Sequence, residues 1–112
     1  MFIRCAFFRG TVKPGMEEAF TQYIRRELVP LWTRFPGAQE VRVLRQTESD
    51  VSDPHLALVL SVRFPTRESI DVALASEVRM QSKEVSKALI AMFDGTVFHT
   101  IFKADEYGLP TD

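Results

Sequence analysis

The chain is poor in the side chains that build disulfides and metal centres. Among its 112 residues there is one cysteine, Cys5, and there are two histidines, His55 and His99. A single cysteine excludes a disulfide or a thiolate metal cluster within one chain. The sequence contains neither H-x-x-x-H nor C-x-x-C spacing. We therefore expect no metal site, and a lone thiol fits a reducing cytoplasm.

The sequence also has no large excess of positive or negative charge and no long apolar run. Lys and Arg number 14 against 15 Asp and Glu, a formal net charge of -1, so no global field attracts nucleic acid or an anionic membrane. No stretch approaches the roughly 18 apolar residues of a membrane span. Arginines interrupt the hydrophobic start of the chain, which therefore lacks the core of a signal peptide. We expect a soluble cytoplasmic protein that binds neither nucleic acid nor membranes.

The sequence is rich in apolar residues. They make up 46% of the chain and charged residues 26%, which is the composition of a folding chain rather than of a disordered one. A chain of this length supports one hydrophobic core. We expect a single domain over residues 1–104, followed by a loose C-terminal tail over residues 105–112.

Hydrophobic periodicity predicts the order strand, helix, strand, strand, helix, strand. Pro30 should kink or divide the first helix near its end, and Asp94-Gly95 should form a turn. The order matches the βαββαβ ferredoxin-like fold, an α+β architecture in which helices cover one face of a four-stranded antiparallel sheet. The predicted strands cover 2–10, 38–47, 55–64 and 96–103, and the helical regions cover 16–35 and 66–93. Thr66 should cap the start of the second region, and Ser76 and Ser82 offer competing caps after a break within it.

Alternation along the strands predicts which face of the sheet the helices leave open. In the third strand Leu56, Leu58, Leu60, Val62 and Phe64 should face the helices, and Ala57, Val59, Ser61 and Arg63 should lie opposite. By the same argument the open face would carry Arg4, Ala6, Phe8, Arg42, Leu44, Val97, His99 and Ile101. An apolar face of this kind needs a cover. We therefore expect a homodimer, the commonest form of self-association.

Four segments of the sequence resemble those of one known superfamily. They are Val12-Lys13-Pro14-Gly15-Met16-Glu17-Glu18-Ala19-Phe20, Arg63-Phe64, Ala73-Leu74-Ala75-Ser76 and Phe93-Asp94-Gly95-Thr96-Val97. With them the chain resembles the dimeric α+β barrel superfamily, especially its antibiotic biosynthesis monooxygenase-like branch, over nearly the whole domain. The resemblance implies two sheets that face each other across a dimer and close a barrel, with a ligand pocket between each sheet and its own helices.

The resemblance also implies a function. It indicates a cofactor-independent monooxygenase acting on a small aromatic or polyketide-like substrate, or alternatively a non-enzymatic dimeric ligand-binding protein like the stress-responsive barrels. Several relatives depend on a pocket asparagine, and haem-degrading relatives use a histidine in the second helical region. This chain has no asparagine, and residues 66–93 hold no histidine. Haem degradation is therefore not expected, and oxygenation would need another donor such as His99, Trp32 or Tyr23.

His99 is the first candidate catalytic residue, because it lies mid-strand among apolar neighbours and histidine ordinarily titrates near neutrality. One hypothesis makes it a proton shuttle or an orienting group for a phenolic substrate. The alternative is a core or interface histidine that bonds a backbone carbonyl. Trp32 and Tyr23 lie on the apolar stripe of the first helix, where they either pack the core or form the floor of a pocket.

Three arginines are the candidate ligand-binding residues. Arg4, Arg42 and Arg63 are expected to converge on one face of the sheet and to clamp an anionic or carbonyl-bearing ligand. The alternative is that they form ion pairs across the dimer with carboxylates such as Glu40 and Glu48.

Overall fold

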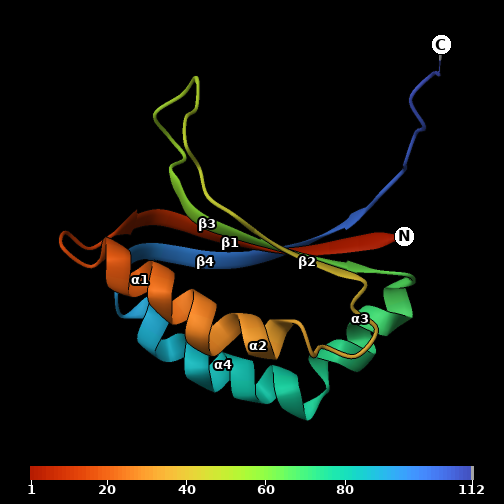
Figure 1. Ribbon diagram of the computed structural model, residues 1–112, viewed down its shortest axis with the longest axis horizontal. Helices are drawn as coiled ribbons and strands as arrows, with labels where there is room; N and C mark the ends of the chain where they lie inside the picture. Colours follow the sequence, from red (N-terminus) through yellow and green to blue (C-terminus); the bar gives the residue numbers. More distant parts are fainter. Residues whose placement is uncertain (112) are drawn as a thin grey trace.

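A four-stranded antiparallel sheet forms one layer of the molecule, and the helices form the other (Figure 1). The computed structural model describes residues 1–111. The strands are β1 (Phe2–Val12), β2 (Glu40–Leu44), β3 (Leu56–Phe64) and β4 (Phe93–Lys103), in the spatial order β2-β3-β1-β4. The helices are α1 (Glu17–Tyr23), the π-helix η1 (Ile24–Leu28), α2 (Val29–Trp32), α3 (Arg67–Leu74) and α4 (Glu77–Ile90). The predicted ferredoxin-like fold is confirmed.

The first helical region runs without interruption from α1 through η1 to α2. Its buried side chains, Phe20, Ile24, Leu28 and Trp32, recur every four residues. Such a repeat drifts by about 40° per step around an α-helix, and the wider π turn offsets part of that drift. The backbone N–H of Val29 reaches the carbonyl of Ile24 five residues earlier. Pro30 lies in the first turn of α2, so the predicted division of the helix near its end is confirmed as a change from π- to α-helix.

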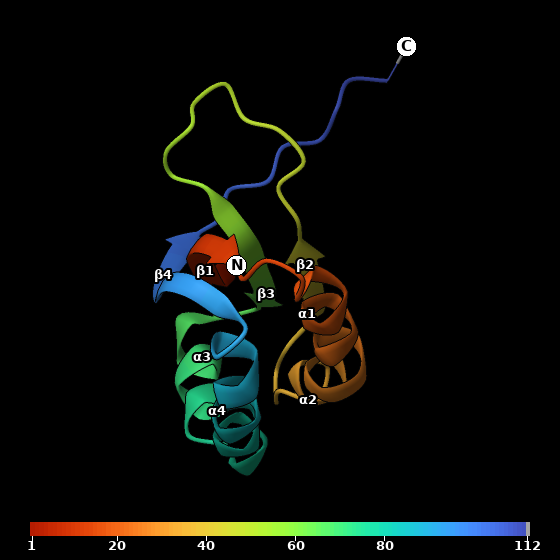
Figure 2. The ribbon, with the colours of Figure 1, turned by 90° about the vertical axis from the view of Figure 1, so that its left-hand side faces the viewer.

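The second helical region is divided, as predicted, and of the two competing caps it is Ser76 that begins the second segment. The Thr66 side chain accepts a hydrogen bond from the Ser69 backbone N–H at the start of α3, and the Ser76 side chain accepts one from the Arg79 N–H at the start of α4. These side chains satisfy donors that a helix N-terminus leaves unpaired. Figure 2 shows α3 and α4 beneath the β4 side of the sheet, with α1 and α2 beneath the β2 side.

Cross-strand neighbours show which side chains face the helices. Ala6 lies opposite Leu60 on one side and His99 on the other, and directly opposed residues share a face of the sheet. Leu60 is buried against the helices, as alternation in β3 predicted. Ala6 and His99 therefore face the helices too. The expectation that β1 and β4 would turn Arg4, Ala6, Phe8, Val97, His99 and Ile101 to the open face is wrong, whereas that for Arg42 and Leu44 is confirmed.

The error has a physical cause in the sequence of β1. Both alternating sets of this central strand are apolar apart from their arginines, because the strand is covered on the helix side and has an aromatic cluster on the other. Because both sets are apolar, the alternation of side chains along this strand does not show which set faces the helices. A charged residue such as Arg4 is then expected on the face away from the helices. The structure instead places Arg4 under the helices.

Asp94-Gly95 is not a turn but part of β4. Gly95 lies directly opposite Gly10 of β1. A Cβ on Gly95 would meet the Arg9 carbonyl oxygen at 2.0 Å, and a Cβ on Gly10 would meet that of Asp94 at the same distance. The two glycines allow the backbones to approach closely, and β4 consequently begins at Phe93, before the start that the sequence predicted.

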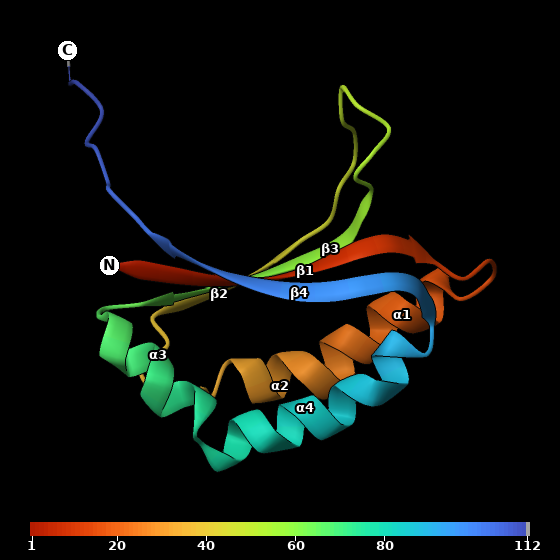
Figure 3. The same cartoon turned by 180° about the vertical axis from the view of Figure 1, so that it is seen from behind.

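The open face of the sheet carries an aromatic cluster. Phe7 stacks on Phe98 with ring centroids 5.1 Å apart, and Phe102 meets Phe7 edge-on at 6.5 Å. Phe98 and Phe102 remain 45% and 44% exposed. The loop between β2 and β3 and the segment after Lys103 both project beyond this face, away from the helices (Figures 1 and 3). The expected tail ends at Asp112, which lies outside the described residues.

Within residues 1–111, no helix combines the length and apolar character needed to cross a bilayer.

Candidate functional site

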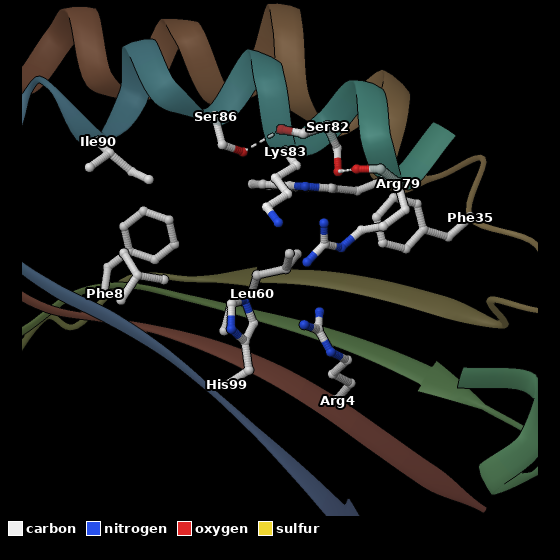
Figure 4. A pocket seen from close by; sticks show the side chains of 13 residues that line it. Arg4, Phe8, Phe35, Leu60, Arg79, Ser82, Lys83, Ser86, Ile90 and His99 are labelled. Atoms are coloured by element: carbon white, nitrogen blue, oxygen red, sulfur yellow. Dashed lines mark hydrogen bonds between the residues drawn. The ribbon is translucent and has the colours of Figure 1, made fainter. Parts of the chain in front are cut away.

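A cavity of about 220 Å³ lies between the helix-facing side of the sheet and α4 (Figure 4). One wall is the sheet, the opposite wall is α4, and the end of the first helical region closes one side. The sheet contributes Arg4, Ala6, Phe8, Leu60, Val97 and His99, α4 contributes Arg79, Ser82, Lys83, Ser86 and Ile90, and the remaining side is formed by Trp32 and Phe35. Its position between a sheet and its own helices is the one the resemblance implied.

The exposure of the lining residues shows where the cavity opens. Trp32 and Phe35 are buried, so the α2 side is closed. His99, Lys83 and Ile90 are exposed, and they belong to β4, the edge strand of the sheet, and to α4. Figure 3 shows these two elements on the same side of the molecule. The mouth therefore lies between β4 and α4.

The polar part of the cavity is cationic. Arg4 extends from β1 towards α4, while Arg79 and Lys83 extend from α4 towards the sheet (Figure 4). Burial, and secondarily the charge of Arg79, lower the pKa of Arg4 to about 10. Arg4 nonetheless stays protonated at neutral pH. Among residues 1–111, no carboxylate belongs to the cavity lining, so three positive charges share one cavity without a compensating acid from that part of the chain.

His99 is neutral in this environment. Burial is the largest cause, with smaller contributions from Arg4 and Arg79, and together they lower the pKa of His99 to about 4. Because His99 also lies exposed at the edge strand, solvent screens part of this effect. A neutral imidazole can accept a proton or a hydrogen bond from a ligand in the cavity.

Two serines on α4 make their hydroxyl bonds within the helix. The Ser82 hydroxyl donates to the Arg79 carbonyl at 2.9 Å, and the Ser86 hydroxyl donates to the Ser82 carbonyl at 2.6 Å. Their lone pairs remain available as acceptors. These bonds satisfy polar groups on the inner face of α4, which lets that face stay polar beside a largely apolar sheet.

The structure brings together three of the six candidate residues. His99, Trp32 and Arg4 all line the cavity. Tyr23 lies outside it, and its hydroxyl donates to the Val85 carbonyl at 2.8 Å, which ties α1 to α4.

The other two arginines lie on the open face. Arg42 is opposite Ser61 and pairs with Glu40 at 2.7 Å. Arg63 is opposite Ile3 and lies 3.8 Å from Glu106. The expected convergence of Arg4 with Arg42 and Arg63 is therefore wrong, because Arg4 belongs to the alternate set of the sheet.

Sequence reasoning missed Arg79 and Lys83. Residues 79, 82, 83, 86 and 90 follow three-and-four spacing and share one helix face. A stripe that is polar except for one isoleucine ordinarily faces water, which is why it did not suggest a site. Its orientation towards the sheet follows only from the packing of α4.

No model of a protein family matches the sequence, and no curated protein matches it significantly. Solved structures do match. An ethyl tert-butyl ether D (EthD) family protein from Bacillus halodurans C-125 is 18% identical over 94% of this chain and 99% of its own, with a TM-score of 0.72. SnoaB, a cofactor-independent oxygenase from Streptomyces nogalater solved as a mutant, is 22% identical over 95% of both chains, with a TM-score of 0.65.

A third match carries a ligand. The monooxygenase from the gene ActVA-Orf6 of Streptomyces coelicolor, in complex with nanaomycin D, is 15% identical over 98% of this chain and 92% of its own, with a TM-score of 0.67. At these identities the likeness is one of fold. The chain thus has the fold of antibiotic biosynthesis monooxygenase-like α+β proteins, and the predicted resemblance is confirmed at that level.

Proposed function

We propose that this protein is a cofactor-independent monooxygenase-like enzyme that acts on a small aromatic or polyketide-like substrate. The observation that carries the proposal is the cavity, which joins a neutral histidine, a cationic cluster and apolar aromatic walls. Two proteins of the same fold, SnoaB and the Streptomyces coelicolor protein, are an oxygenase and a monooxygenase. The fold therefore supports this chemistry, and the cavity contains groups suited to it.

In the proposed reaction His99 accepts a proton from an acidic methylene group of the substrate, and the cations stabilise the resulting carbanion. The carbanion adds molecular oxygen, and protonation by His99 gives a hydroperoxide on the same carbon. Loss of water, with the remaining hydrogen of that carbon, then leaves a carbonyl group, so one oxygen atom enters the product and the other leaves as water. All four electrons come from the substrate carbon, and no external reductant is needed.

The neutral state of His99 suits this role only because the anion forms beside Arg4 and Arg79. A histidine with a low pKa is a weak base on its own. The two arginines that disfavour imidazolium favour the substrate anion, and a bound anion in turn reduces their repulsion of a protonated His99. Trp32 forms an aromatic wall for the substrate ring.

We propose that the enzyme works as a homodimer in which a second copy covers the open face. Phe7, Phe98 and Phe102 form an exposed aromatic cluster there, and contiguous apolar surface of this kind marks an interaction site. Arg42 and Arg63 lie on the same face. Their proposed role is accordingly in the dimer rather than at the substrate.

The test of the catalytic role compares two histidine variants. His99→Gln should reduce oxygen uptake with 2-indanone, a ketone with acidic methylene groups beside one aromatic ring, by about 100-fold or more, the usual size of a general-base contribution. His55→Gln is the matched control, because His55 is exposed in the loop before β3 and its ring bonds Gln46, outside the cavity lining. An oxygen electrode measures both variants against the unmodified protein.

Two outcomes would contradict the proposal. Undiminished uptake by His99→Gln would remove His99 from the mechanism. Ligand binding with no oxygen uptake by the unmodified protein, on 2-indanone and on phenols such as catechol, would favour the alternative of a non-enzymatic dimeric binding protein.

A further inference from the structure

In the described part of the chain, no carboxylate pairs with the three cations of the cavity. Arg4, Arg79 and Lys83 form no ion pair within residues 1–111. Other unpaired cations, such as Arg25 and Arg45, are exposed on the surface, whereas these three share one cavity between the sheet and α4. Like charges gathered in a partly buried site destabilise the folded protein unless an opposite charge compensates them. The low pKa of Arg4 is one sign of that cost. An anion is the occupant that would remove it.

The cavity is polar at one end and apolar at the other. Figure 4 shows the side chains of Arg4, Arg79 and Lys83 directed towards one another, while Phe8 and Ile90 lie together away from Arg79. Phe8 is buried among aromatic neighbours and holds a fixed position. An apolar wall combined with a few convergent polar groups is the usual form of a small-molecule site. The fitting ligand is therefore amphipathic, with its negative charge at one end.

The size of the cavity limits the apolar part of that ligand. An engineered apolar cavity of roughly 150 Å³ accommodates benzene, and this cavity measures about 220 Å³. The available space corresponds to one aromatic ring with a short charged substituent. Because guanidinium groups bind carboxylates through paired hydrogen bonds, a carboxylate is the substituent that the two arginines recognise best.

We propose that the cavity selects a small aromatic carboxylate, with its acid group among Arg4, Arg79 and Lys83 and its ring against Phe8 and Ile90. This assignment deepens the proposed function and rests on its use of the same cavity. It narrows the substrate class from aromatic compounds in general to single-ring acids. The methylene group that the proposed oxygenation requires would link that ring to the acid group, next to His99, which lies under the influence of Arg4 and Arg79.

The binding test uses benzoate and benzamide, which have nearly the same shape and differ in charge. Trp32 is the only tryptophan of the chain and lines the cavity, so its fluorescence reports occupancy directly. Benzoate should bind saturably and at least about tenfold more tightly than benzamide, the ratio expected from one charge-assisted hydrogen bond. Equal affinities, or no binding of benzoate, would overturn the proposal.

Matched variants locate the charge. Arg79→Met and Lys83→Met should each weaken benzoate binding about tenfold and leave benzamide unchanged. Lys87→Met is the control, since Lys87 lies one turn further along α4 and pairs with Glu84 outside the cavity. Arg79→Lys keeps the charge and should recover part of the affinity, which separates lost charge from lost folding. Unchanged benzoate affinity in Arg79→Met and Lys83→Met would refute the assignment.

These measurements are independent of turnover. Binding of benzoate without any oxygen uptake would support the ligand class while refuting the oxygenase. Oxygen uptake with neutral 2-indanone, combined with no preference for benzoate over benzamide, would support the oxygenase while refuting the ligand class.

Discussion

His99 shows how neighbouring charges set the state of one residue. The sequence places a histidine mid-strand, and an isolated histidine would titrate near 6.5. In the folded protein the pKa of His99 falls to about 4, through burial first and then through the charges of Arg4 and Arg79. At neutral pH it is therefore a hydrogen-bond or proton acceptor on its unprotonated nitrogen, and not a cation that would repel the arginines.

The first prediction follows from the smaller causes of that shift. Arg79→Met removes a positive charge near His99 and should raise the pKa of His99 towards its ordinary value. Arg25→Met is the control, because Arg25 is exposed on η1 and outside the cavity lining. The ring-proton chemical shifts of His99, followed by NMR against pH, measure both variants. The same titration midpoint for His99 in Arg79→Met and the unmodified protein would show that Arg79 has no influence.

The same shift affects stability with a defined sign. Between pH 6.5 and about 4 the unfolded chain protonates His99 while the folded protein does not. Since the unfolded state then binds more protons, acidification through this window lowers the free energy of unfolding. His99→Gln should flatten that part of the curve in urea unfolding experiments.

Among the elements, the β1–β4 pair depends on two glycines. Gly95 has φ +154° and Gly10 has φ +144°, values that residues with a Cβ rarely adopt. Each glycine also lies against the opposing backbone. The pairing extends β4 to Phe93, whose ring lies 5.5 Å from that of Phe8. This contact helps to position the apolar end of the cavity.

The second prediction concerns that pair. Gly95→Ala would place a Cβ 2.0 Å from the Arg9 carbonyl oxygen, which the two backbones can accommodate only by separating. We expect a loss of roughly 3 kcal/mol in the free energy of unfolding. Gly108→Ala is the control, because nothing lies within 4 Å of its Cβ position, and it should be neutral. Equal unfolding midpoints in urea for the two variants would contradict the close approach of the strands.

At the scale of the whole molecule, the two layers leave one face of the sheet uncovered. The helices of residues 1–111 lie on the other side (Figures 1 and 2), so Leu44, Phe98 and Phe102 remain nearly half exposed. An antiparallel sheet tolerates one solvated face only when that face is polar. A second copy would bury this apolar surface and form the proposed dimer.

The third prediction tests that arrangement. Phe98→Glu places a charge within the aromatic cluster and should convert a dimer to a folded monomer at micromolar concentration, because burial of unpaired charge at an interface is unfavourable. Val72→Glu is the control, since Val72 is 61% exposed on α3, on the helical side, and it should remain dimeric. Sedimentation velocity distinguishes the species. A monomeric unmodified protein, or a dimeric Phe98→Glu variant, would refute the arrangement.

The sequence by itself determined the order of the elements and the approximate extent of the helical regions. Period changes, the caps at Thr66 and Ser76, and the contrast between the two faces of β3 are local properties, because each depends on residues a few positions apart. They were sufficient to identify the fold and to place Trp32 on a buried helix stripe and His99 within the last strand. The single cysteine and the balanced charges restricted the classes of function in the same way.

Only the tertiary structure decided which residues form the site. The side to which Arg4 points depends on the register of β1 against β3, and an apolar central strand does not reveal that register through alternation. The meeting of Arg4 with Arg79 and Lys83 depends on how α4 packs against the sheet. Such contacts join segments far apart in the chain, and their energies are spread over the whole core. The cationic cavity therefore became visible only once the layers were assembled.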